Sequence, residues 1–149
     1  MSAAQDPGFN ALVLAGGRGT RLGGEAKAEI QLHGQRLVDR VVAAARKTGA
    51  RRVVVVGPES AGTQADSVIR EDPSFAGPLA GIAAGLAELA GSANAEWTMV
   101  LACDLQRPVA VASALIGGFG QRAADGLLLV DAEGHTQWLA GIYRTSALA

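Results

Sequence analysis

A glycine-rich segment near the beginning of the chain carries the residues best suited to binding an anionic ligand. Five glycines occupy the nine positions 16–24, and Arg18, Arg21 and Lys27 lie within this segment or just after it. Glycine lets successive backbone N–H groups point to one place, and the resulting concavity binds anions. The three cations add formal positive charge there. The segment therefore predicts a polyphosphate site.

A carboxylate that follows a run of apolar residues is the second candidate. Asp104 comes directly after residues 99–103, which are all apolar. Proteins hold Mg²⁺ with one or two carboxylates together with water or substrate phosphate oxygens, so one aspartate is sufficient to place the ion. Asp104 could instead cap the helix that follows, although Gln106 and Arg107 are nearer to its expected start at Pro108.

The other reactive side chains do not indicate a second site. Cys103 is the one cysteine of the chain, which excludes an internal disulfide and a site with several thiolates, and we expect it to be a small buried residue. His33 and His135 are far apart in the sequence and are not expected to form a metal site or a catalytic pair. The aromatic residues expected to pack on the sheet, and not to stack on a base, are Trp97, Trp138 and Tyr143.

Segments with strand and helix character alternate along the chain. Strands are predicted at residues 9–15, 53–56, 67–70, 97–103, 127–131 and 137–143, with a short extended piece at 28–32 before a turn at Gly34. Helices are predicted from residue 37 to a stop at Gly49, from 78 to about 90 and from 108 to about 122.

This alternation predicts a three-layer, Rossmann-like α/β fold, in which a mainly parallel, twisted sheet has helices on both faces. Such sheets bind their ligands at the carboxyl ends of the strands. The glycine-rich segment and Asp104 both follow predicted strands. We therefore expect both to lie at the ligand-binding edge of the sheet.

The composition indicates a single compact domain. The chain has 149 residues, 49% of them hydrophobic, and we expect residues 9–149 to form one domain after a flexible tail at 1–8 that is not a secretory signal. The net charge of −1 gives no electrostatic basis for binding nucleic acid or a membrane surface. No run of about 18 apolar residues is present, and the expected location is the cytoplasm.

Two other phosphate-binding motifs fit the glycine-rich segment less well. No stretch matches the Walker motif G-x-x-x-x-G-K-[ST]. The dinucleotide motif G-x-G-x-x-G needs a glycine where Leu22 stands, and Gly23 comes one position late. That motif also needs an acidic residue after the next strand, and Glu59 follows Gly57 and Pro58 there. We therefore rank a dinucleotide-dependent oxidoreductase third among the functional hypotheses.

Four segments together resemble one family of enzymes. Residues 14–27 contain L-A-G-G-x-x-x-R-L-G-x-x-x-K, which resembles the nucleotidyltransferase signature. The segments E-D-P at 71–73, G-P-L-A-G at 77–81 and L-A-C-D at 101–104 are similar to those of the MobA-like molybdenum cofactor guanylyltransferases. All occur in the family's order, and the resemblance covers residues 10 to 145.

The resemblance implies a Mg²⁺-dependent transfer of GMP from GTP to the phosphate of molybdenum-molybdopterin, with release of pyrophosphate, in the synthesis of molybdopterin guanine dinucleotide. It implies that Arg21, Lys27 and Asp104 are catalytic, with Asp104 as the metal ligand. The implied partners are GTP and a pterin phosphate acceptor. The implied nucleotide-binding residues are Leu14, Ala15, Gly16, Gly17, Lys27, Asp72, Gly77, Pro78, Leu79 and Asp104.

The sequence departs from the family pattern at two places. The family carries an asparagine at the end of the second core strand, where this chain has Val56, Gly57 and Pro58. The family also continues for some tens of residues after the position of Ala149, with a segment near the acceptor that we expect this chain to lack. A longer natural chain, a second chain in a homo-oligomer or other complex, or a different acceptor would each account for this.

Two alternatives to the guanylyltransferase hypothesis therefore stay open. Within the same class, CTP could replace GTP, or a sugar phosphate could replace the pterin. In a different class, the chain could be a nucleotide-binding module without turnover.

Overall fold

A six-stranded sheet forms the centre of the computed structural model, which describes residues 8–15, 21–22, 25–26, 30–58, 61, 64–70, 77–90, 95–118 and 125–148. For 21–22 and 25–26 the description is of the backbone. The strands are β1 (Phe9–Leu14), β2 (Arg21–Leu22), β3 (Glu25–Ala26), β4 (Gln31–Leu32), β5 (Gln35–Arg36), β6 (Val53–Val56), β7 (Ser67–Ile69), β8 (Trp97–Ala102), β9 (Gly126–Val130) and β10 (Thr136–Arg144). The helices are α1 (Leu37–Lys47), α2 (Pro78–Ala90), α3 (Pro108–Gly118) and α4 (Thr145–Leu148).

The main sheet is mostly parallel. Its strand order is β7-β6-β1-β8-β10-β9. The strands β7, β6, β1 and β8 pair in parallel, whereas β10 is antiparallel to both β8 and β9. The mainly parallel α/β sheet expected from the sequence is confirmed, with β10 inserted against the direction of its neighbours.

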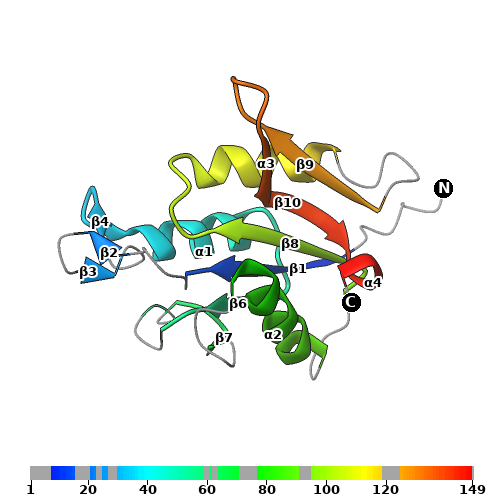
Figure 1. Cartoon of the computed structure of the whole chain (residues 1–149), viewed down its shortest axis with the longest axis horizontal. Coiled ribbons are helices and arrows are strands. Elements are labelled where there is room, and N and C mark those ends of the chain that lie inside the picture. The colour runs from blue at the N-terminus through cyan, green and yellow to red at the C-terminus, as the bar shows by residue number, and fades with distance from the viewer. Residues whose placement is uncertain are drawn as a thin grey trace.

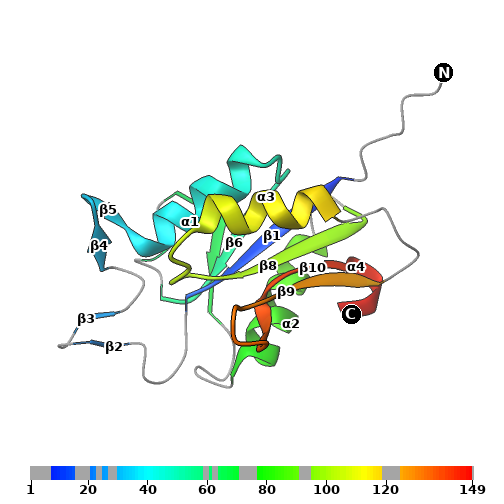
Figure 2. The same cartoon turned by 90° about the horizontal axis from the view of Figure 1, so that it is seen from above.

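Helices cover both faces of this sheet, with α1 and α3 on one face and α2 on the other (Figures 1 and 2). Side chains of β1 point alternately to the two faces, as the pleat of a strand requires. Val13 packs in the core cluster under α1 and α3, whereas Leu12 packs with Leu89 of α2. The predicted three-layer architecture is therefore confirmed.

Helix α1 forms where apolar residues recur at helical spacing. Val38, Val41 and Val42 are fully or almost fully buried on one face of this helix. The helix ends where Gly49 adopts φ +110 and donates its N–H to the carbonyl of Arg46 at 3.0 Å. This left-handed conformation costs glycine little, so the predicted stop at Gly49 is confirmed.

Several predicted segments extend beyond the described residues. The segments concerned are 1–7, 28–29 and 119–122.

The predicted turn at Gly34 lies between β4 and β5, and the predicted helix start after Gly77 is the start of α2. Within the described part of the chain, no helix is both long enough and apolar enough to cross a membrane.

Candidate functional site

The carboxyl ends of three parallel strands meet at one edge of the sheet. Leu14, the last residue of β1, is in register with Val56 on β6 and with Ala102 on β8. The ladder continues one residue further, because the Ala15 N–H donates to the Val56 carbonyl at 2.8 Å and the Cys103 N–H donates to the Leu14 carbonyl at 3.1 Å. Ala15, the last described residue before the glycine-rich segment, is therefore held beside the turn that follows β8.

Asp104 lies in that turn, two residues after the last paired residue of β8, and is partly buried. Among the residues that the structure describes, no group of three or more His, Cys, Asp or Glu side chains could enclose a metal ion. A single carboxylate suits Mg²⁺, which takes the remaining oxygen ligands from water and from substrate phosphates. The lone carboxylate of Asp104 is therefore compatible with an ion that takes its other ligands from water and phosphate.

Helix α2 begins at the same edge. An added Cβ at Gly85 would contact Leu12, and one at Gly81 would lie 3.4 Å from Val56 and 3.6 Å from Leu14, so α2 runs against the direction of β1. Its first turn therefore lies beside the ends of β1 and β6. A helix start carries unpaired N–H groups and a partial positive charge.

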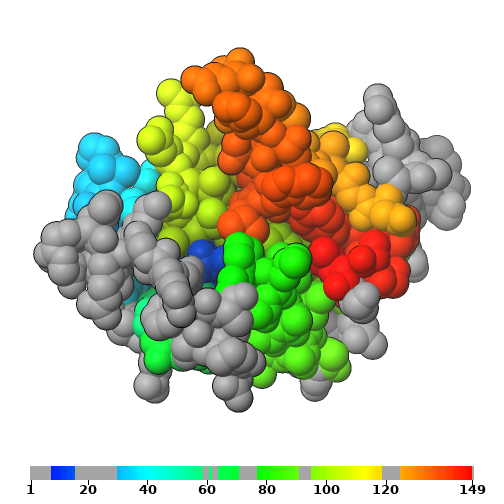
Figure 3. Space-filling view, in the orientation of Figure 1, coloured from blue at the N-terminus to red at the C-terminus, as the bar shows by residue number. Residues whose placement is uncertain are grey.

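Helix α2 presents an exposed apolar side chain near this edge. Leu79, in the first turn of α2, is 82% exposed although it is a large apolar residue. Figure 3 shows the blue end of β1 at the surface between the green beginning of α2 and the yellow-green segment that follows β8. An exposed leucine near the ends of β1 and β6 is suited to contact with a planar apolar surface such as a base.

The predicted site residues divide into three groups. Those that the structure describes fully lie around the ends of β1 and β8 or at the start of α2, and they are Leu14, Ala15, Gly77, Pro78, Leu79 and Asp104. Arg21 is described by its backbone, which pairs with Ala26. The predictions that lie outside the described residues are Gly16, Gly17, Lys27 and Asp72.

Arg40 ties the segment after β8 to helix α1, a contact that the sequence did not predict. Its guanidinium Nη2 donates to the Gln106 carbonyl at 3.1 Å, although the two residues are 66 positions apart. Both residues also line a cavity of about 540 Å³ between α1 and the start of α3. The contact fixes the segment that carries Asp104 from the side of α1.

Replacing Arg40 with alanine is expected to loosen residues 104–107. The lost hydrogen bond is exposed and contributes about 1 kcal/mol, which corresponds to a roughly fivefold faster hydrogen exchange of these amides. The matched control is Arg46→Ala on the same helix, because Arg46 Nη2 donates instead to the Gln64 carbonyl at 2.9 Å. Equal exchange at 104–107 in both variants and the wild type would show that Arg40 does not position this segment.

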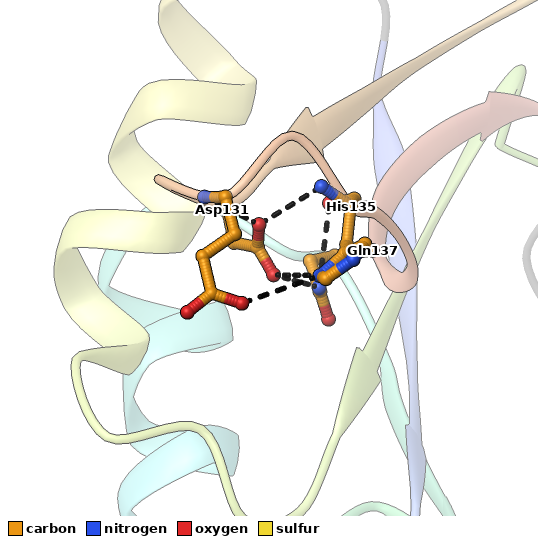
Figure 4. Close-up of polar contacts among 4 residues, drawn as sticks. Asp131, His135 and Gln137 are labelled. Carbon is orange, nitrogen blue, oxygen red and sulfur yellow. Dashed lines mark hydrogen bonds and ion pairs between the residues drawn. The ribbon is translucent and has the colours of Figure 1, made fainter.

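The hairpin between β9 and β10 is held by one carboxylate (Figure 4). Asp131 Oδ1 accepts the N–H groups of Glu133 and His135, each at 2.9 Å, and Asp131 Oδ2 accepts Gln137 Nε2 at 3.0 Å. His135 Nδ1 lies 3.5 Å from Asp131 Oδ2. These contacts fix the backbone of the turn. His135 lies in this hairpin, whereas His33 lies in the separate hairpin of β4 and β5.

One prediction about aromatic residues is wrong. Trp97 is buried at 4% exposure and Tyr143 packs against the core, as expected, but Trp138 is 67% exposed. The pairing between β9 and β10 shifts its register between Gln137 and Gly141, and Trp138 lies in this irregular part of β10. The prediction that Cys103 is buried is confirmed, at 5% exposure.

Comparison with solved structures defines the class of the fold. A nucleotidyl transferase from Methanothermobacter superimposes with a TM-score of 0.67 at 22% identity, over 94% of this chain and 73% of that one. Molybdopterin-guanine dinucleotide biosynthesis protein A from Archaeoglobus fulgidus superimposes with a TM-score of 0.63 at 25% identity, over 93% of this chain and 69% of that one. The fold is therefore the one found in nucleotidyltransferases.

The family follows from sequence comparison. The model of the MobA-like NTP transferase domain matches residues 11–149, and the chain belongs to this family. A protein of Opitutus terrae described as a probable molybdenum cofactor guanylyltransferase is 36% identical over 141 residues, which are 92% of this chain and 67% of that protein. The chain spans about half the length of the Pseudomonas molybdenum cofactor guanylyltransferases that it also matches. The family assignment favours the nucleotidyltransferase hypothesis over the dinucleotide-dependent oxidoreductase.

Proposed function

We propose that this protein transfers GMP from GTP to the phosphate of molybdenum-molybdopterin and releases pyrophosphate. The observation that carries the proposal is the junction of β1 and β8, where the Cys103 N–H donates to the Leu14 carbonyl, so that Asp104 follows β8 at the edge where β1 ends. A phosphate-binding segment and a carboxylate at one edge are the two parts that this chemistry needs. The similarity to a probable molybdenum cofactor guanylyltransferase supports the choice of substrates.

In the proposed reaction an oxygen of the acceptor phosphate attacks the α-phosphorus of GTP, and the bond from that phosphorus to the bridging oxygen breaks. Pyrophosphate leaves with the bonding electrons. Since both reactants are anions, catalysis depends mainly on alignment and on neutralising charge. A bound Mg²⁺ supplies positive charge to the phosphate oxygens.

The protein's own residues would bind and orient the nucleotide. We assign the backbone from Leu14 to Gly17 to the phosphates, with Arg21 and Lys27 as their cationic partners. Asp104 would hold the Mg²⁺ ion. This assignment is a proposal for every one of these residues, and it is supported by the edge at which Leu14 and Asp104 lie.

The start of α2 is our candidate for recognition of the guanine base. Gly77, Pro78 and Leu79 lie near this edge, and we assign Asp72 to the nucleoside. After β6 the chain has Gly57 and Pro58, so no side-chain amide is available there to bind a nucleotide. Backbone groups and the apolar Leu79 side chain would then contribute most of the contact with the base.

Calorimetric titration with GTP in the presence of Mg²⁺ tests the nucleotide assignment, with CTP and TTP as controls. We expect GTP to bind most tightly and Mg²⁺ to be required. Tighter binding of CTP would contradict the guanylyl assignment.

Pyrophosphate release on addition of molybdopterin tests turnover. GTP binding without any release across pterin and sugar-phosphate acceptors would instead favour a nucleotide-binding module. We also propose that the reaction takes place in the cytoplasm.

A further inference from the structure

Trp138 is a large apolar side chain that the fold leaves in solvent. It is 67% exposed, whereas the other tryptophan of the chain, Trp97, is 4% exposed in the core. Indole is among the largest apolar side chains and normally contributes by being buried. An exposed tryptophan therefore raises the question of what it contacts when a ligand is present.

Trp138 lies toward the edge of the sheet where the nucleotide is proposed to bind. Ala140 is the first residue of β10, in chain order, that pairs with β8, and it lies opposite Leu101. Since β10 runs antiparallel to β8, Trp138 is displaced from Ala140 toward the carboxyl end of β8. Asp104 lies beyond that same end. In Figure 3 the orange segment of the β9–β10 hairpin borders this side of the molecule.

The backbone at Trp138 is held by contacts on both sides. Tyr143 donates its hydroxyl to the Trp138 carbonyl at 2.8 Å, and the side chain of the preceding residue, Gln137, is bound to Asp131. An added Cβ at Gly141 would lie 2.8 Å from Tyr143 Oη, so the missing side chain at Gly141 gives the Tyr143 ring room to make this bond. Burial raises the pKa of Tyr143 above its ordinary value.

Two exposed apolar side chains thus occur on different sides of the strand ends. Leu79 lies at the start of α2, which packs on β1 and β6, whereas Trp138 lies on β10, which pairs with β8 on the opposite side of β1. If the base binds beside Leu79, as proposed above, the side of Trp138 is left for the second substrate. An exposed indole offers a flat surface that stacks on planar rings.

We propose that Trp138 stacks on the planar heteroaromatic ring of the acceptor and so determines which acceptors bind. This inference rests on the proposed function, because it assigns the second substrate of the same site. Trp138 is a binding residue here and takes no part in the transfer of the nucleotidyl group.

Tryptophan fluorescence tests the contact directly and needs no turnover. The probe is 6-hydroxymethylpterin monophosphate, titrated into the full chain with and without GTP and Mg²⁺. We expect the pterin to quench the emission, and Trp138→Phe to remove the quench, because the remaining Trp97 is buried. Absence of a quench in the wild type, or a quench of Trp138 caused by GTP without the pterin, would overturn the inference.

Kinetics of pyrophosphate release with molybdopterin provide the second measurement. Trp138→Ala is expected to raise KM for the acceptor by about tenfold, within the range found when aromatic residues that stack on bases are replaced by alanine. The KM for GTP should stay unchanged, and Trp138→Phe should restore most of the acceptor affinity. Val130→Ala is the matched control, because Val130 is an exposed apolar residue of the same hairpin at 58% exposure.

The two proposals fail in distinguishable ways. If the wild type binds no GTP in the calorimetric titration, the proposed function is wrong, and the pterin quench still decides whether Trp138 contacts a planar ring. If GTP binds and pyrophosphate is released, but Trp138→Ala leaves the acceptor KM unchanged, the inference about Trp138 is wrong while the proposed function stands.

Discussion

Replacing Asp104 with asparagine is expected to lower kcat for pyrophosphate release by about 10²- to 10³-fold, comparable to the loss of one preorganised group that stabilises transition-state charge. Asparagine has nearly the same shape as aspartate but cannot provide a negative charge to Mg²⁺. The fold should therefore be preserved while the proposed metal ligand is lost. The measurement is steady-state release of pyrophosphate from GTP and molybdopterin at saturating Mg²⁺, together with the thermal unfolding midpoint.

The matched control for Asp104 is Glu88→Gln, which neutralises a partly exposed carboxylate near the other end of α2. Glu88 pairs with Arg52 at 3.4 Å, and a surface ion pair of this kind contributes about 1 kcal/mol at most. This variant should retain the wild-type kcat and the wild-type requirement for Mg²⁺. Turnover by the Asp104→Asn variant at the rate of this control would remove Asp104 from the metal role. A large drop in the unfolding midpoint would instead assign Asp104 to the structure of the turn after β8.

The strands and helices of this fold could be predicted because local composition determines them. The four consecutive valines of β6 are all buried. Gly49 follows the end of α1 and Gly77 precedes the start of α2, and both glycines have a positive φ. Buried parallel strands have apolar residues on both faces, so such runs are visible without knowledge of their neighbours. The positions of Leu14 and Asp104 at one edge followed from the same reasoning, since both end predicted strands.

The features that the sequence did not reveal depend on contacts between distant segments. The insertion of β10 between β8 and β9 is a matter of strand order, and Trp138 leaves the core because the β9–β10 register shifts beside it. In the sequence, residues 137–143 have the apolar character of an ordinary strand. The bond from Arg40 to Gln106 joins helix α1 to the segment before α3, and no local pattern connects the two. Gly141, two residues before Tyr143, was the available sequence signal for the contact between Tyr143 and the Trp138 backbone. Its role is evident only from the structure, in which the Tyr143 ring lies against Gly141.

The packing of α2 on β1 leads to the second large expected effect, which concerns stability. Leu12 is fully buried and packs with Val54 and Leu89. Leu12→Ala should lower the free energy of unfolding by about 3–5 kcal/mol, because it removes buried methyl groups and leaves a cavity between the sheet and α2. Chemical denaturation measured by circular dichroism gives this free energy.

Gly85 on α2 is the partner that makes this prediction specific. A Cβ at Gly85 would lie 2.7 Å from Leu12 Cδ2 and 3.0 Å from Leu12 Cδ1. Gly85→Ala in the wild type should therefore cost about 1–3 kcal/mol in packing strain, offset by about 1 kcal/mol from the higher helix propensity of alanine. In the Leu12→Ala background the clash is absent and the new methyl group fills part of the cavity, so the same substitution should stabilise.

The double-mutant cycle should thus show a favourable coupling of about 1–3 kcal/mol between positions 12 and 85, as expected for residues in contact. Gly81→Ala is the matched control, because its Cβ would make ordinary contacts of 3.4 Å with Val56 and 3.6 Å with Leu14 and would not touch Leu12. Its effect should be the same in both backgrounds. Additive effects of the Leu12 and Gly85 substitutions, within the error of the measurement, would show that α2 does not pack this closely on β1, and the place of its first turn beside Leu14 would then lose its support.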